Sequence, residues 1–267
     1  MPLLRLLRVF AVVAAFGLLA LALGLGLRAE WATALWPWTT GRLTFLFLSS
    51  IAAAIAVPFL WVAWAEEWGA MRGSALFPLL TSAGTAAYLL REPSAGAAGQ
   101  RLAGMAAVGA LFSLAMVLVG RRFALRDGRR QPLLVRISFA VFALVLILAG
   151  GALVLGRPNV MPWPIDRPGG VICGWVFLGA ATGYLYGLLS PAWHNARGPL
   201  LGFLVYDLIL LPPLLGHFEK VKPEHRTSLV LYVAVLLYSG ALATYQLFVA
   251  RATRSWRAAP GRGRGPA

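Results

Sequence analysis

The chain has 267 residues, of which 60% are hydrophobic and only 12% are charged. A soluble domain carries about 25% charged residues, and a water-soluble fold could not cover this much apolar surface. A single cysteine, Cys173, also excludes a secreted scaffold held together by disulfides. The net charge of +15 does not indicate a nucleic-acid binder, because the arginines lie at the ends of hydrophobic segments and not on one solvated face.

Eight segments are apolar enough to cross a membrane, since a spanning helix needs about 20 mainly apolar residues. In chain order they are residues 6–27, 43–64, 74–90, 102–120, 133–156, 171–189, 199–216 and 228–250. The sequence therefore predicts an all-α polytopic membrane protein with eight transmembrane helices.

The distribution of basic residues predicts how these helices are oriented. With eight crossings both termini lie on one side, and most of the 24 lysines and arginines fall on that side. Cytoplasmic loops carry an excess of such residues, so both termini are expected in the cytoplasm and the protein in a bacterial inner membrane. The arginine-rich stretch 121–130 and the basic tail are expected to bind anionic lipid headgroups. No nucleic-acid partner is predicted, and the sequence leaves any protein partner unidentified.

The chain resembles itself at an offset of 125 residues. Pro37-Trp38 then falls on Pro162-Trp163, and Trp68 falls on Trp193. Tryptophan and proline are uncommon, so these matches indicate a tandem duplication. We expect a first four-helix repeat over 1–125, a second over 126–250, and a basic Gly/Pro/Arg cytoplasmic tail over 251–267. Four spans per half predict a parallel 4+4 repeat, with the halves related by a two-fold axis along the membrane normal, and the first segment is expected to be retained because it matches the fifth.

Two short boxes recur in both halves. One is Trp-Pro-Trp with a following arginine (Met161-Pro162-Trp163 in the second copy), and the other is Trp-x-x-x-Arg. Tryptophan favours the membrane interface and arginine can bind lipid phosphate, so anchoring is favoured over a ligand site. The expected interface anchors are Trp38, Arg42, Trp68, Arg72, Trp163, Arg167, Trp193 and Arg197.

At these boxes the sequence resembles a loose group of bacterial multi-pass membrane proteins that have no assigned activity. The resemblance covers residues 36–73 and 161–198, and the first copy departs from the second by having Thr39 where Pro164 stands. It implies membrane location and no particular activity.

Glycines in segment 171–189 predict a helix-packing face. Helices in a membrane associate through close approach of small residues, and the sequence places Gly174, Gly179, Gly183 and Gly187 there. The matching positions in segment 43–64 are also small, so we expect these two helices to pack across the two-fold axis, with packing inside each half as the alternative.

Two ionisable residues lie within the predicted spans, Asp207 and Arg136. Charged groups inside a bilayer are costly and mark functional candidates. Their counterparts in the first half are Ser82 and Ala11, so both charges are absent together, as expected of partners. The two residues are predicted to form an intramembrane ion pair, with a proton- or ion-binding site at Asp207 as the alternative.

Glu66-Glu67 followed by Arg72 resembles the paired glutamates of CAAX-type intramembrane proteases. The arginine comes one residue late, and all three histidines, His194, His217 and His225, fall in predicted loops. A metal site in the membrane needs its ligands at one depth, so no catalytic, metal or cofactor-binding residue is predicted.

The sequence thus favours a non-catalytic structural or accessory component of a bacterial inner membrane. The alternative is a small-solute or ion transporter with a site between the halves near Asp207, and a third interpretation is the membrane protease.

Overall fold

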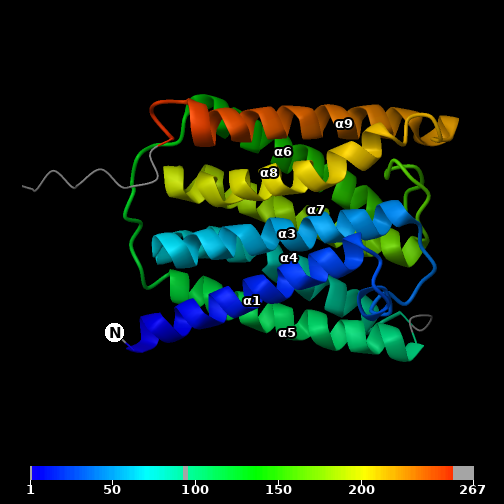
Figure 1. Cartoon of the computed structure of the whole chain (residues 1–267), viewed down its shortest axis with the longest axis horizontal. Coiled ribbons are helices and arrows are strands. Elements are labelled where there is room, and N and C mark those ends of the chain that lie inside the picture. Colours follow the sequence, from blue (N-terminus) through cyan, green and yellow to red (C-terminus); the bar gives the residue numbers. More distant parts are fainter. Residues whose placement is uncertain (1, 93–95, 255–267) are drawn as a thin grey trace, which may run out of the picture.

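The structure, a computed structural model, describes residues 2–92 and 96–254, and its named elements are all helical. The predicted all-α class is confirmed. The long helices run along the long axis of the molecule (Figure 1). In chain order the elements are α1 (Pro2–Gly26), a short α2 (Glu30–Thr33), α3 (Arg42–Ala65), the 3-10 turn η1 (Trp68–Ala70), α4 (Met71–Leu89), α5 (Gly96–Gly120), α6 (Leu133–Val154), α7 (Arg167–Leu189), α8 (Trp193–Leu215), α9 (Pro223–Thr244) and the π-helical turn η3 (Tyr245–Val249).

Seven of the described helices are long and apolar enough to cross a membrane, namely α1, α3 and α5 to α9. The chain is therefore a multi-pass helical membrane protein. The eighth long helix, α4, has 19 residues and includes Arg72 together with glycine, serine and threonine. It packs against both α5 and α7, so less of its surface needs to be apolar, and its crossing of the membrane remains a prediction.

All eight predicted segments fall on helices, but six of the described helices begin three to six residues before their predicted starts. Segment 199–216 belongs to α8, which begins at Trp193, and segment 74–90 belongs to α4, which begins at Met71. The early residues of α8 include His194 and Arg197, both of which are buried. A segment chosen for its apolar residues stops at charged or polar side chains such as these. In the structure, however, the protein interior accommodates them.

The helices pack as a central group of four with an outer helix beside each. At the centre α3 packs against α8, and α4 packs against α7. On the outside α1 packs on α3, α5 on α4, α6 on α7, and α9 on α8. Both central contacts join residues of the first predicted repeat to residues of the second.

The glycines of α7 face two different helices. A Cβ on Gly174 would lie 2.8 Å from the carbonyl oxygen of Gly150 in α6, and one on Gly187 would lie 3.0 Å from the Phe139 ring, also in α6. A Cβ on Gly179 would lie 2.7 Å from the carbonyl oxygen of Phe77 in α4. The glycines of α7 therefore contact α4 and α6. They do not form the expected contact with α3, the helix of segment 43–64.

The repeated boxes lie largely inside the protein and not at the lipid interface. Trp163 is buried, donates from Nε1 to Thr44 Oγ1 of α3 at 3.0 Å, and has its ring centroid 6.0 Å from that of Phe47. In the other direction, a Cβ on Gly169 of α7 would lie 3.2 Å from the Trp36 ring. Each box therefore contacts the central helix of the other predicted repeat, which explains why its indoles are not available to lipid headgroups.

The other expected anchors are divided between the surface and the interior. Arg42 and Arg167 are exposed, whereas Trp38 and Arg72 are half-buried. Trp68, Trp193 and Arg197 are buried, so these three are not lipid anchors. Arg72 donates to the carbonyl oxygen of Gly120 at the end of α5, at 3.4 Å, where a cation also interacts favourably with the helix dipole.

Replacing Gly179 with alanine should destabilise the fold, whereas the same change at Gly183 should not. The Gly179 Cβ would contact α4 backbone, while the nearest atom to a Cβ on Gly183 is 4.0 Å away. Overpacking costs about 1–3 kcal/mol, so the free energy of unfolding in detergent should fall by that amount for Gly179→Ala alone. Equal stability of the two variants would contradict the α4–α7 contact.

Candidate functional site

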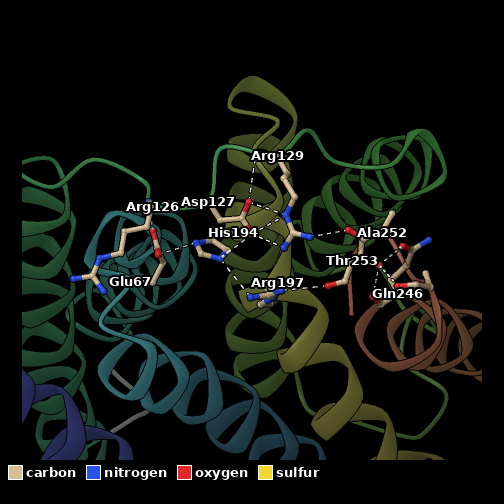
Figure 2. A network of polar contacts seen from close by, with 10 residues as sticks. Glu67, Arg126, Asp127, Arg129, His194, Arg197, Gln246, Ala252 and Thr253 are labelled. Atoms are coloured by element: carbon tan, nitrogen blue, oxygen red, sulfur yellow. Dashed lines mark hydrogen bonds and ion pairs between the residues drawn. The ribbon is translucent and has the colours of Figure 1, made fainter. Parts of the chain in front are cut away.

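A group of buried polar side chains gathers at the end of the bundle that holds the N-terminus. We call Glu67, Asp127, Arg129, His194 and Arg197 the polar network (Figure 2). Glu67 follows α3, Asp127 and Arg129 lie in the linker between α5 and α6, and His194 and Arg197 lie in the first turns of α8. Four of the five are buried, and only Arg129 is partly exposed.

His194 lies at the centre of the polar network, between two carboxylates. Its Nδ1 is 2.9 Å from Glu67 Oε2, and its Nε2 is 3.3 Å from Asp127 Oδ2. The edge of its ring meets Trp61 of α3, with centroids 5.6 Å apart. The imidazole therefore connects α3 with the linker that joins the two predicted repeats.

Asp127 is held as a carboxylate by Arg129. Arg129 Nε donates to Asp127 Oδ1 at 2.8 Å, and Arg129 Nη1 donates to the carbonyl oxygen of Ala252 at 2.8 Å. Burial opposes ionisation of Asp127, but the hydrogen bonds from Arg129 outweigh it and hold the pKa of Asp127 below its ordinary value. The same pairing raises the pKa of Arg129. The pair is therefore charged at neutral pH and connects the linker to the chain beyond α9.

Arg197 is only 1% exposed. Its Nη1 lies 3.3 Å from His194 Nε2, and its Nη2 donates to the carbonyl oxygen of Thr253 at 3.2 Å. Its guanidinium carbon lies 5.6 Å from the centre of the Trp193 ring and 6.0 Å from that of Trp61. Cation–π contacts at such distances favour a buried cation. The hydrogen bond to Thr253 joins α8 to the residues after α9.

Glu67 and Glu66 are neighbours in the sequence with different environments. Glu67 Oε1 accepts the backbone N–H of Arg126 at 2.8 Å, so both of its oxygens have close partners. The Glu66 side chain is 52% exposed and lies near Arg8 and Arg126 at 3.4 and 3.8 Å. Only the second glutamate belongs to the polar network.

The polar network contains two carboxylates and two guanidinium groups around one imidazole. Burying a charge is tolerated when it is paired and hydrogen-bonded, and the pair Asp127–Arg129 and the contacts of Glu67 with His194 and Arg126 meet that condition. Within residues 2–92 and 96–254, no group of three or more His, Cys, Asp or Glu side chains is arranged to hold a metal ion.

As the sequence predicted, the three histidines do not lie at one depth. His194 lies in the polar network, whereas His217 and His225 lie at the opposite end of the bundle, after α8 and at the start of α9. His225 Nδ1 is hydrogen-bonded to the carbonyl oxygen of Met161 at 2.9 Å. Contrary to the prediction, His194 and His225 are in helices and not in loops.

Asp207 is buried in α8, with 4% exposure, but it is not paired with Arg136. Its Oδ2 accepts a hydrogen bond from Ser239 of α9 at 2.9 Å. Its Oδ1 has no hydrogen-bond partner among the described residues. Arg136 is exposed in the first turn of α6. The expected ion pair is not formed, because Asp207 is buried whereas the Arg136 side chain is exposed.

Sequence reasoning missed the polar network, although a signal was present. Glu67, His194 and Asp127 have Ala192, Gly69 and Pro2 as their counterparts at the 125-residue offset. All three exceptions lie at the same end of the bundle, and that shared location could have indicated a site.

No protein-family model matches this chain, and searches of the curated proteins and of the solved structures give no match either.

Replacing Glu67 with glutamine should destabilise the protein far more than replacing Glu66 with glutamine. Glutamine removes the negative charge beside His194 and replaces one of the two acceptor oxygens with a donor NH2 group, and leaving a buried polar group unsatisfied costs about 1–3 kcal/mol. An exposed ion pair such as that of Glu66 contributes roughly 0–1 kcal/mol. Thermal unfolding of both variants in the same detergent provides the comparison, and similar losses would argue against the polar network as a stabilising unit.

The stabilising effect of Asp127 should depend on pH in the acid range. Because its folded-state pKa is lowered, its contribution is full above about pH 3.9, the ordinary value for aspartate, and is lost as the pH falls through the folded-state pKa. The stability difference between wild type and Asp127→Asn should therefore be constant near neutral pH and shrink below it. A difference that grows on acidification would contradict the pairing with Arg129.

Proposed function

We propose that this protein is a non-catalytic structural or accessory component of a bacterial inner membrane. The observation that carries the proposal is the burial of the polar network. Its acids, its imidazole and Arg197 are at most a few per cent exposed and contact one another. A substrate could not reach Glu67 or His194 without breaking these contacts, so the network is better suited to holding helices together than to chemistry.

The proposed duplication is supported by the way the predicted repeats meet. A Cβ on Gly179 of α7 would lie 2.7 Å from the carbonyl oxygen of Phe77 in α4, and one on Gly202 of α8 would lie 3.0 Å from that of Ala54 in α3. At the 125-residue offset Ala54 corresponds to Gly179, and Phe77 corresponds to Gly202. The pair Gly179–Phe77 therefore corresponds to the pair Ala54–Gly202. An approximate two-fold axis between the halves requires such paired contacts.

The proposed orientation has both termini in the cytoplasm. The linker between α5 and α6 lies at the N-terminal end of the bundle (Figure 1), and its exposed arginines are Arg121, Arg122, Arg126 and Arg130. Each basic residue near an anionic leaflet contributes about 1 kcal/mol of attraction. We propose that this surface contacts anionic lipid headgroups and that nucleic acid is not a partner. Residues 255–267 of the proposed basic tail lie outside the described residues.

Labelling of introduced cysteines tests this orientation. The native Cys173 is buried, so it contributes little background. Arg91→Cys after α4 should react with a membrane-impermeant maleimide added to intact cells, whereas Arg122→Cys should react only after the membrane is opened. The reverse pattern would place the termini outside, and equal labelling of both would show that the two ends do not lie on opposite sides.

A transporter is the second candidate, and the environment of Asp207 favours it. One carboxylate oxygen has no partner among the described residues, and Ser239, which binds the other oxygen, lines a cavity between the predicted repeats. Intramembrane carboxylates in such positions often carry protons or cations.

Proton uptake into proteoliposomes distinguishes the two candidates. With an imposed pH gradient and an enclosed pH-sensitive dye, a structural component should give the rate of protein-free liposomes, for both wild type and Asp207→Asn. Uptake by the wild type that Asp207→Asn abolishes would overturn the structural proposal in favour of the transporter. The conservative Ser82→Ala, at the position equivalent to Asp207 in the first repeat, provides a matched control.

A further inference from the structure

A cavity of about 360 Å³ lies between the two predicted repeats. This is within the range of roughly 300–1,000 Å³ that small-molecule sites occupy. Helices α3 and α4 of the first repeat and α6 to α9 of the second contribute to its walls. The wall residues on which the argument depends are Gly183, Phe203, Tyr206, Ser228, Leu231 and Ser239.

The cavity opens sideways between α6 and α9. Towards the N-terminal end the two helices are joined, because the hydroxyl groups of Ser138 and Tyr238 are 2.7 Å apart. Beyond that contact, Val145 of α6 and Leu231 and Val235 of α9 line the cavity while remaining 42%, 63% and 37% exposed. In a spanning helix an exposed apolar side chain faces lipid, so the opening leads into the hydrocarbon layer.

The shape of the cavity is elongated. Along α9 its lining residues run from Ser228 to Ser239, which corresponds to about 16 Å at a rise of 1.5 Å per residue. A volume of about 360 Å³ distributed over that length describes a narrow channel. Such a channel fits a linear chain better than a compact solute.

The polar groups in the walls are largely engaged with the protein. The hydroxyl groups of Tyr206 and Tyr232 are hydrogen-bonded to each other, and Ser239 donates to Asp207 at 2.9 Å. Ser228 donates to the carbonyl oxygen of Asn159 at 2.6 Å. The remaining walls are mainly aliphatic and aromatic, so the cavity offers dispersion contacts and few free hydrogen-bonding groups.

We propose that a hydrocarbon chain of a bilayer lipid inserts between α6 and α9 and occupies this cavity. A lipid chain gains nothing from leaving water, because the bilayer is already apolar. An empty channel, however, leaves the atoms of its walls without contact partners, and an inserted chain restores those contacts. Binding is therefore governed by shape, and the site selects an unbranched chain that reaches from Leu231 to the region of Phe203.

Photolabelling in nanodiscs tests this assignment. The probe is a phosphatidylcholine with a diazirine near the end of one acyl chain, and adducts are located by mass spectrometry of peptides. Adducts on interior residues such as Ala180 and Phe203, in addition to outward-facing ones, are expected. Adducts confined to outward-facing residues would overturn the proposal.

Two variants and a control make the test specific. Gly183→Leu should place its side chain in the cavity, since Gly183 lines the cavity and a Cβ there has Gly73 O, 4.0 Å away, as its nearest neighbour from another helix, and Leu231→Trp should block the opening. Both should reduce the interior adducts to the level of an unirradiated sample, while unchanged thermal unfolding shows that the fold is intact. Leu111→Trp, a change at an equally lipid-facing position of α5, should leave them unchanged.

A second probe distinguishes the acyl chain of a bilayer phospholipid from a free fatty acid. A fatty acid bearing the same diazirine, added to protein in detergent, should label the interior less than the phospholipid does in nanodiscs. Interior labelling by a small polar diazirine compound, with none by the phospholipid, would show that the cavity is a solute site and would overturn the assignment. Interior adducts that persist in both Gly183→Leu and Leu231→Trp would overturn it as well.

Discussion

The packing of α3 on α8 and of α4 on α7 is the constraint on which the rest of the structure depends. In a bilayer there is little hydrophobic drive between helices, so association requires close contact of backbones. Gly179 and Gly202 permit that contact on α7 and α8. Each of these four central helices packs against one outer helix: α1, α5, α6 or α9. The cavity lies where the outer helices α6 and α9 leave a gap.

At the end of the same bundle, the polar network provides partners for buried polar and charged side chains. The start of α8 carries His194 and Arg197 into the protein, where neither could remain without partners. Glu67 and Asp127 are the partners of His194, and the carbonyl oxygen of Thr253 accepts from Arg197, so both side chains find partners in chain segments that are distant in sequence. The helices of this protein thus meet through small residues near their middle and through charged contacts where they end, and both kinds of contact connect the two predicted repeats.

The helices were predictable from the sequence because their apolar segments are long and are separated by arginine and proline. The start of α8 was not, because burial of Arg197 depends on partners that no local pattern reveals. For the same reason, tryptophans such as Trp163 and Trp193 were assigned to the lipid interface. Composition gives the preference of an indole for interfaces, but only the packing of α3 shows that a protein interior is available to Trp163.

The hydrogen bond from Arg197 to Thr253 has a consequence for biosynthesis. Thr253 follows the last helix, whereas Glu67 and Asp127 are synthesised much earlier. Arg197 is therefore synthesised before the carbonyl oxygen of Thr253 that accepts one of its hydrogen bonds. A chain that ends before Ala252 would lack the carbonyl oxygens of Ala252 and Thr253, so Arg129 and Arg197 would each lose a hydrogen-bond acceptor.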